Sequence, residues 1–381
     1  MRPRRFVPLL LALALAAGFA GARTATADAV IGQPLCGTEG TAPAPATSGA
    51  LHVATFNVLH GLSEDPPDYP AHSTLDERTE MAAEQLAASG VDLVGMQEVS
   101  FTAANDQTRH TPGLVVQRIA AQMAQTSGHS WHWCWYLANP HVPGEDTAAG
   151  GGGPLSDQLA ALGSSRYASF KEGVAVLSRY PILLAEGRRL PSRLPAEAAL
   201  CPPESFTQFP PECAATVVIE SRAALWARVA APGGATDIVT THLAHGLTDA
   251  SDASAFTQVA AALAFAEQKS ADGAAARRFF TCDCNSRRDD DVPVVPSIEA
   301  AGWTDMFPET CESAGDAGCT AGPDKIVTDT PMRDFMDARI DYVFEKSCPA
   351  EDAGLLANQA RARDDGSYLW PSDHIGIIAT C

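Results

Sequence analysis

The chain has 381 residues, of which 46% are hydrophobic and 19% are charged, and its formal net charge at pH 7 is −20. This length is ample for a large hydrophobic core, organised as one big domain or two smaller ones. The strong negative charge argues against broad, non-specific binding to nucleic acid or to anionic membranes, although a bound cation or a local basic patch would still permit a nuclease.

The N-terminus has the pattern of a secretory signal peptide. Basic residues at positions 2, 4 and 5 precede an apolar run over residues 6–20, and Ala27-Asp28-Ala29 is a small-x-small cleavage site. The run is too short to span a membrane, so we expect residues 1–29 to be removed, the protein to be secreted, and no integral membrane segment to remain. Cleavage removes four of the 26 basic and one of the 46 acidic residues, which leaves 22 and 45 and a net charge of −23.

The first half of the mature chain predicts alternating strands and helices. Residues 30–50 are expected to be an irregular lead-in, and residues 51–381 to form the main folded domain. A helix is expected from the capping residue Thr74 to about Ser89, ended by Gly90, and a strand then ends at Glu98. A second helix has one apolar face, made of Val116, Ile119, Ala120 and Met123. The aromatic residues Trp131, Trp133, Trp135 and Tyr136 are interpreted as a buried strand rather than as a hairpin that enters a membrane.

The second half continues this alternation. Residues 144–156 contain four consecutive glycines and are expected to form a flexible insertion, and residues 170–182 form a strand. After a proline-rich loop at 190–215, two strands within residues 216–243 are joined by a turn at Pro232-Gly233-Gly234. The next helix is expected to have one face made of Phe256, Val259, Ala260 and Leu263. Strands over RRFFTCDCN, ARIDYVF and SDHIGIIAT complete a mixed, layered α/β domain.

Ten cysteines, all beyond the cleavage site, indicate a disulfide-bonded exported protein. The local pairs expected are Cys201 with Cys213, Cys311 with Cys319, and Cys348 with Cys381. Cys282 and Cys284 would point to the opposite face of their strand from Asp283. They are interpreted as buried disulfide halves, because the alternative, a thiolate zinc site, lacks a second CxxC-type pair.

Six short polar clusters stand at the ends of apolar, strand-like runs. They are Asn57 in HVATFNVLHG, Gln97-Glu98 in VDLVGMQEV, Thr241-His242 in DIVTTHLAHG, Asp283 and Asn285 in FFTCDCNS, Arg339 and Asp341 in ARIDYVF, and Ser372-Asp373-His374 in WPSDHIGI. Strands carry such groups to a shared pocket at one edge of a sheet. The set suits metal-assisted attack of water on a phosphate ester.

The candidate metal ligands are Glu98, Asp373 and the amide of Asn57. Mg²⁺ is the expected cation, with Mn²⁺ and Ca²⁺ as alternatives, because hard cations take oxygen ligands. A carboxylate at the end of an apolar strand is costly unless it is paired or metal-bound. The competing interpretation is that Glu98 caps the following helix.

Two histidines are candidates for proton transfer. His374 is the expected base, with Asp341 holding one imidazole nitrogen and fixing the tautomer. His242 is the expected donor of a proton to the leaving alkoxide, oriented by Glu172.

The DxN pair, Asp283 and Asn285, lies two residues apart, so both side chains face one side of a strand. The aspartate can align or deprotonate a water, and the amide can hold a phosphate oxygen. A simple Asp-Cys-Asn turn is the competing interpretation. The sequence has no GxSxG, HExxH, P-loop or GxGxxG motif, and a Ser-His-Asp hydrolase would lack a nucleophile turn.

The ordered set TFN, QE, TH, DxN, RxDY and SDH resembles the endonuclease/exonuclease/phosphatase superfamily over residues 51–380. That group includes DNase I-like nucleases, abasic-site endonucleases, inositol-phosphate phosphatases and bacterial neutral sphingomyelinases. The resemblance implies a four-layer α/β sandwich of two packed mixed β-sheets flanked by helices, with the site at one end of the sheets. It also implies the roles given above for the metal-site, DxN and histidine residues. The family usually has Gly before the DxN aspartate and a bulky apolar residue after it, where this chain has Cys282 and Cys284.

These inferences predict a secreted, monomeric, Mg²⁺-dependent phosphodiesterase. The motifs THLAHG and EGVAVLSRYPI resemble the phospholipase C/sphingomyelinase branch more than DNase I, which favours a phospholipid head group as substrate. The first alternative is a secreted DNase I-like endonuclease, for which Arg287-Arg288 could grip a nucleic-acid phosphate. The second alternative is a non-catalytic binding module with the same fold.

Overall fold

The computed structural model describes residues 33–44, 49–59, 74–102, 111, 113–140, 171–191, 222–244, 249–322, 326–331 and 333–381. The expected signal peptide, the glycine-rich segment 144–156, the pair Cys201 and Cys213, and most of the proline-rich loop lie outside these residues. Among the described helices, none has the length and apolar character needed to cross a membrane.

The first sheet joins segments from both halves of the chain. Its strands are β1 (Leu35–Glu39), β2 (His52–Asn57), β3 (Leu93–Thr102), β4 (Gly113–Leu114), β5 (Trp131–Pro140), β6 (Lys171–Ser178), β14 (Asp352–Leu356) and β17 (Gly376–Thr380). The order is β1-β5-β6-β3-β2-β17-β14, and β4 pairs with β3. β2 runs parallel to β3, whereas the other neighbours are antiparallel, so the sheet is mixed.

The second sheet is formed by segments from residues 182–346, in the middle of the chain. Its strands are β7 (Ile182–Arg189), β8 (Ala223–Ala231), β9 (Gly234–His242), β10 (Arg277–Asp283), β11 (Thr304–Asp305) and β13 (Asp341–Lys346), in the order β11-β13-β10-β9-β8-β7. β9 and β10 are parallel and the other pairs are antiparallel. A small third sheet joins β12 (Val327–Thr328), β15 (Arg361–Ala362) and β16 (Tyr368–Leu369).

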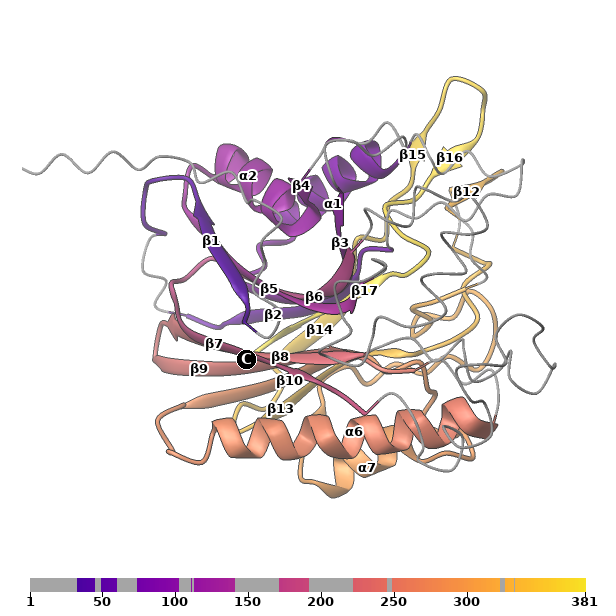
Figure 1. The fold of residues 1–381 in the computed structure, drawn as a ribbon. Helices are drawn as coiled ribbons and strands as arrows, with labels where there is room; N and C mark the ends of the chain where they lie inside the picture. Colours follow the sequence, from indigo (N-terminus) through magenta and orange to yellow (C-terminus); the bar gives the residue numbers. More distant parts are fainter. Residues whose placement is uncertain are drawn as a thin grey trace, which may run out of the picture.

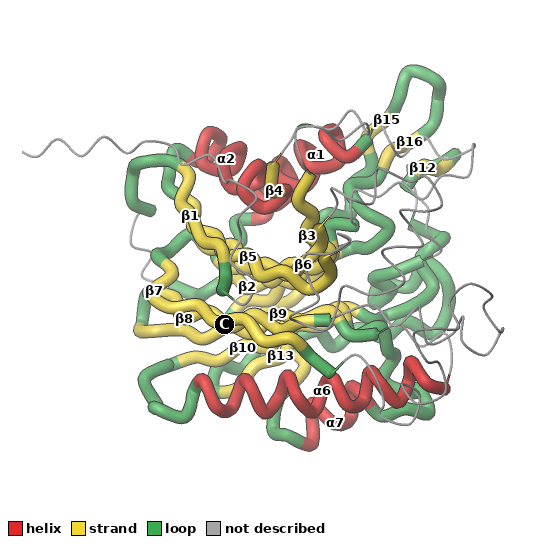
Figure 2. The backbone as a smooth tube through the Cα atoms, in the orientation of Figure 1, coloured by secondary structure: helices red, strands yellow, loops and turns green. Residues whose placement is uncertain are grey.

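The two large sheets pack face to face, and helices cover their outer faces (Figure 1). Helices α1 (Leu75–Ser89) and α2 (Val115–Ser127) lie on the first sheet, and α6 (Asp249–Lys269) and α7 (Val294–Ala300) lie on the second, as the tube in Figure 2 also shows. Three hydrophobic clusters fill the spaces between these four layers. The predicted four-layer α/β sandwich is therefore confirmed.

Helical periodicity predicted α2 better than α6. All four residues of the predicted apolar face of α2 are buried, as the 3.6-residue repeat requires. In α6, Val259 and Leu263 are buried as expected, but Ala260 is exposed and Phe256 is 45% exposed. The buried face runs instead through Ala255, Ala262 and Phe265. Because α6 is rich in alanine, several stripes around it look apolar, and the sequence pattern does not separate them.

The segment before residue 51 is more ordered than expected. Residues 35–39 form β1, which pairs with the aromatic strand β5, and Cys36 is joined to Cys134 by a disulfide. Trp131, Trp133 and Trp135 are buried, so the aromatic run is a core strand as predicted.

The two large sheets approach each other closely near one end. Gly95 of β3 faces Thr240 and Thr281 of the second sheet, and a Cβ at position 95 would lie only 1.9 Å from Thr281 Oγ1. Beside this contact, Gln97 Nε2 donates hydrogen bonds to Thr240 Oγ1 (3.0 Å) and Thr55 Oγ1 (3.1 Å). The absence of a side chain at Gly95 allows the two sheets to approach closely. The hydrogen bond from Gln97 to Thr240 then links the sheets where the polar clusters lie.

Candidate active site

Three of the predicted residues form a line across the second sheet. His242 is the last residue of β9, Asp283 is the last of β10, and Asp341 is the first of β13. The register pairs Asp283 with His242 on one side and with Asp341 on the other. Because β13 runs antiparallel to β10, its beginning lies at the same sheet edge as the ends of β9 and β10.

The first sheet contributes Asn57 and Glu98 from neighbouring strands. Asn57 ends β2 as predicted, but β3 does not end at Glu98 and continues to Thr102. The register of β3 with β6 shifts between Met96 and Val99, and Glu98 has a φ of 54°. Such a β-bulge redirects a side chain that simple strand alternation would point elsewhere. The bulge brings the Glu98 carboxylate within 2.9 Å of Asn57 Nδ2.

The amide of Asn57 links the two sheets. Its Nδ2 donates to Glu98 Oε1 (2.9 Å) and to Asp283 Oδ2 (2.8 Å), and its Oδ1 accepts from the backbone N–H of Leu59 (2.9 Å). The Leu59 donor fixes the amide orientation, because only the oxygen can accept it. Asn57 therefore presents donors, not its oxygen, to the two carboxylates.

Asp283 stands at the centre of the site. Its carboxylate belongs to two groups of potential metal-ligating side chains, one with Glu98 and His242 and the other with Asp341 and His374. Burial, followed by the nearby carboxylates of Asp341 and Glu98, raises the pKa of Asp283 to about 7, against the opposing effects of His374 and the Asn57 hydrogen bond. A carboxyl group with this pKa is half-protonated near neutral pH.

His374 is held by Asp341, as predicted. Its Nδ1 lies 2.9 Å from Asp341 Oδ2, and its Nε2 lies 3.7 Å from Asp283 Oδ2. Burial by itself lowers the pKa of His374, but the carboxylates of Asp341 and Asp283 outweigh burial and raise this pKa well above 6.5. The Thr320 hydroxyl accepts the backbone N–H of Asp341, and the Thr320 carbonyl accepts that of Ile375. One residue thereby ties the start of β13 to the segment that carries His374.

His242 has an unexpected partner. Arg222 Nη1 lies 2.7 Å from His242 Nδ1, whereas Glu172 Oε1 lies 4.0 Å from that nitrogen and 3.9 Å from Arg222. Arg222 therefore lies between Glu172 and His242, and the expected role of Glu172 in orienting His242 stays a prediction. Arg222 was missed by sequence reasoning. It immediately precedes β8, which runs antiparallel to β9, so Arg222 lies beside the end of β9.

The other nitrogen of His242 lies near the DxN asparagine. Its Nε2 is 2.9 Å from Asn285 Nδ2 and 3.5 Å from Asp283 Oδ2. A neutral imidazole has one acceptor nitrogen, so His242 accepts from Arg222 or from Asn285 but not from both. The Arg222 contact is shorter and charge-assisted, so we assign Nδ1 as the acceptor and place the proton on Nε2.

The DxN segment is both a turn and part of the site. The backbone N–H of Asn285 donates to Asp283 Oδ1 (3.0 Å), Asn285 has a φ of 47°, and its Nδ2 donates to the Leu243 carbonyl (2.9 Å). Asp373, next to His374, accepts a hydrogen bond from the Ser372 hydroxyl (3.2 Å) and is in neither group of potential metal ligands. Its role as a ligand stays a prediction.

Comparison with known proteins agrees with this architecture. The family model of the endonuclease/exonuclease/phosphatase family matches residues 54–374. The chain belongs to the endonuclease/exonuclease/phosphatase family. The family is one of phosphoesterases and includes nucleases and phosphatases. No curated protein matches the chain.

Solved structures of family proteins share the fold. A family protein from Bacteroides thetaiotaomicron has a TM-score of 0.54 at 13% identity, covering 92% of this chain and 95% of its own. A mannosyl-6-phosphatase from B. thetaiotaomicron VPI-5482 has a TM-score of 0.54 at 12% identity, covering 87% and 99%. A family protein from Beutenbergia cavernae DSM 12333 has a TM-score of 0.51 at 18% identity, covering 87% and 71%. At such identities the likeness shows the fold alone.

A second residue missed by sequence reasoning is Arg78 of α1, which binds the two chain segments next to Asn57 and next to the SDH motif. It is 3% exposed, and its Nη1 donates to the carbonyls of Val58 (3.1 Å), Leu59 (3.3 Å) and Pro371 (3.4 Å). These carbonyls follow Asn57 and precede the SDH motif. The signal was present in the sequence, because Arg78 shares the apolar stripe of α1 with Leu75 and Leu86.

The donors in the site fit a hard divalent cation, which many members of this family use. Ligand atoms of Glu98, Asp283 and His242 lie within 4.8 Å of one another, and so do those of Asp283, Asp341 and His374. Asp341 Oδ1 is buried and, within the described part of the chain, has no hydrogen-bond partner. Converging buried carboxylates repel one another, and oxygen-ligated cations such as Mg²⁺ relieve that repulsion. Glu98, Asp283 and Asp341 are the oxygen donors in these groups that could hold such an ion.

Proposed function

We propose that the protein is an exported, Mg²⁺-dependent phosphodiesterase, with Mn²⁺ or Ca²⁺ as alternative ions. The observation that carries this proposal is the position of Asp283, which is shared between a carboxylate–histidine group on each side. Export is supported by the N-terminal signal pattern and by the four disulfides of the described residues. A bound cation would neutralise charge on the phosphate and favour deprotonation of a nearby water.

The Asp283–His374 pair is proposed to take the proton of the attacking water. His374 lowers the pKa of Asp283, and the Asp283 carboxylate raises the pKa of His374, so the two groups titrate as a pair. Asp341 keeps the imidazole oriented through Nδ1, which leaves Nε2 facing Asp283. A buried carboxylate whose pKa is raised to about 7 is a stronger base than an exposed one, which suits general base catalysis.

His242 is proposed to serve the leaving oxygen. With Nδ1 accepting from Arg222, its Nε2–H points toward Asp283 and Glu98, 3.5 Å and 3.9 Å away. The neutral ring can then donate a hydrogen bond to the departing alkoxide, and the protonated ring can transfer its proton to it and return to the neutral form. Asn285, whose amide nitrogen lies beside the same ring atom, is placed to orient a phosphate oxygen.

The preferred substrate is a phospholipid head group, as the THLAHG and EGVAVLSRYPI motifs suggest. Two side chains that could have favoured nucleic acid are engaged elsewhere. Arg287 donates to the Asp337 carbonyl (3.0 Å), and Arg288 contacts Glu299 and Asp305, both at 2.8 Å. The burial of Trp131, Trp133 and Trp135 likewise removes these aromatic residues as a membrane anchor. The preference for a phospholipid substrate therefore rests on the two sequence motifs alone.

One experiment tests the proposal and orders the substrates. Purified mature protein is assayed side by side on sphingomyelin vesicles, supercoiled DNA and soluble phosphate monoesters, each with Mg²⁺ and with excess chelator. Chelator-sensitive hydrolysis of sphingomyelin supports the proposal as stated, and preferential cleavage of DNA supports the endonuclease alternative. Tight Mg²⁺ binding without hydrolysis of any of these or of bis-p-nitrophenyl phosphate would instead indicate a binding module.

A further inference from the structure

We propose that the disulfide between Cys282 and Cys284 is a covalent brace that holds Asp283 and Asn285 in their working positions. This inference rests on the proposed function, in which both residues act on the phosphate or the water. The two cysteines replace the glycine and bulky apolar residue that the family usually has around its DxN aspartate. Cys282 and Cys284 are therefore positioning residues, because their sulfurs act on the reaction only by holding Asp283 and Asn285 in place.

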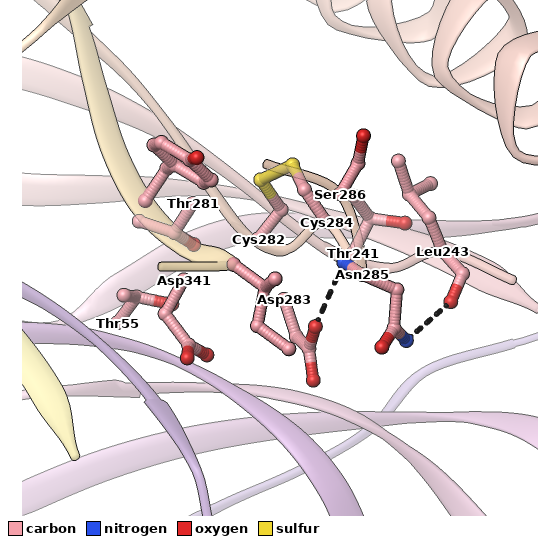
Figure 3. Close-up of a disulfide and its surroundings, with 12 residues drawn as sticks. Thr55, Thr241, Leu243, Thr281, Cys282, Asp283, Cys284, Asn285, Ser286 and Asp341 are labelled. Atoms are coloured by element: carbon pink, nitrogen blue, oxygen red, sulfur yellow. Dashed lines mark hydrogen bonds between the residues drawn. A yellow bond between two sulfur atoms is a disulfide. The ribbon is translucent and has the colours of Figure 1, made fainter. Parts of the chain in front are cut away.

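The bond closes a small ring that has Asp283 in its middle. The Cα atoms of Cys282 and Cys284 are 5.0 Å apart, whereas two steps along an extended strand span about 6.6 Å. The backbone is therefore drawn in at Asp283. Figure 3 shows the arrangement: the sulfurs lie on one side of the chain, and the carboxylates of Asp283 and Asp341 lie on the other.

The sulfur side is anchored in the core. Both cysteines are 0% exposed and belong to the hydrophobic cluster between the second sheet and α6 and α7. The backbone N–H of Cys284 donates to the Ile340 carbonyl (2.8 Å), and the Asp283 carbonyl accepts from Leu243 (3.0 Å). A ring fixed on one face by packing and at its edges by these hydrogen bonds leaves Asp283 little freedom to move.

The brace also determines where the strand turns. β10 ends at Asp283, and two residues later Asn285 has a left-handed φ of 47°, a conformation that non-glycine residues rarely adopt. The Asn285 N–H bonds back to Asp283 Oδ1, so the turn couples the two DxN side chains. The disulfide shortens the Cα–Cα distance between Cys282 and Cys284, so the backbone departs from the fully extended form immediately before this turn.

A general stabilising role explains this disulfide less well. In the chain-entropy account, stabilisation by a disulfide grows with the logarithm of the loop that it closes. Cys282 and Cys284 are separated by 2 positions, compared with 33 for Cys348 and Cys381. The short ring therefore restricts the unfolded chain least, and its effect is local.

The test compares two disulfide-free double variants. Cys282→Ala/Cys284→Ala removes the brace, and Cys348→Ala/Cys381→Ala removes a bond at the other end of β2, where Leu51 and Cys381 exchange backbone hydrogen bonds. Thermal unfolding, kcat and KM on bis-p-nitrophenyl phosphate with Mg²⁺, and hydrogen exchange of residues 282–286 are measured for both and for the wild type.

Loss of the brace should lower kcat by about 10²-fold, the typical effect of a misplacement of about 1 Å, with a smaller change in KM. It should also accelerate exchange at 282–286 while the melting temperature changes little. The control should melt at a lower temperature than the brace variant and keep the wild-type kcat and local exchange. If alanine prevents folding, Cys282→Ser/Cys284→Ser replaces it.

The inference about the disulfide and the proposed function would be refuted by different results. Wild-type kcat and unchanged exchange at 282–286 in a folded brace variant would overturn the inference. Absence of hydrolysis by the wild type would instead refute the proposed function, and the exchange measurement would still decide whether the disulfide restrains Asp283 and Asn285.

Discussion

The buried carboxyl of Asp283 predicts an unusual pH dependence of stability in the metal-free protein. Its pKa rises from 3.8 to about 7 on folding, so between these values the native state binds more protons than the unfolded state. The free energy of unfolding must then fall as pH rises through this window. At about 1.4 kcal/mol per pH unit, the difference corresponds to roughly 4 kcal/mol at most. His374, whose pKa is also raised, acts in the same direction above pH 6.5.

Asp283→Asn removes the titrating group, so it should flatten this decline and make the metal-free variant more stable than the wild type near neutral pH. Urea unfolding followed by tryptophan fluorescence, in chelator and across about pH 4 to 8, measures the effect. Asp352→Asn, at an exposed carboxylate, is the matched control and should track the wild type. Mg²⁺ should stabilise the wild type more near neutral pH than in acid, because ion and proton compete. If the free energy of unfolding depends on pH in the same way for the wild type and Asp283→Asn, then burial and the neighbouring carboxylates do not raise the pKa of Asp283.

Three further variants test other parts of the structure. Glu98→Gln keeps the shape of the side chain that meets Asn57 but removes its charge, so chelator-sensitive hydrolysis should be abolished while the melting temperature is retained; wild-type turnover would show that Glu98 does not hold the ion. His374→Ala should lower kcat by about 10²–10⁴-fold, and an unchanged rate would mean that another group activates water. Gly95→Ala puts a methyl group 1.9 Å from Thr281 Oγ1 and should destabilise the fold by about 1–3 kcal/mol or more in urea unfolding, whereas Gly354→Ala, with nothing within 4 Å, should not.

The sequence predicted the architecture and most of the site because its signals are local. Asn57, His242 and Asp283 each end an apolar run, and that pattern placed them correctly at strand ends. Alternation along the strand also put Cys282 and Cys284 on the face away from Asp283, and the local pairs Cys311–Cys319 and Cys348–Cys381 were predicted correctly. The thiolate zinc alternative was wrong, since the two cysteines around Asp283 bond to each other.

The features that were missed depend on contacts between distant segments. The bulge at Glu98 arises from the register of β3 against β6, which no single segment encodes. Arg222 became a partner of His242 because two strands run antiparallel, and 20 positions separate these residues in the chain. The orientation of the Asn57 amide was also not foreseen, because the N–H of Leu59 binds its oxygen and turns the amide nitrogen toward the acids; its expected place at the metal site stays a prediction.

The alignment of His242, Asp283 and Asp341 on adjoining strands has an evolutionary consequence. Their mutual spacing follows from the backbone ladder, at about 4.8 Å per strand, and not from any connecting segment. Insertions or exchanges in the connections between strands can therefore alter which molecules reach the reactive groups without disturbing the distances among those groups.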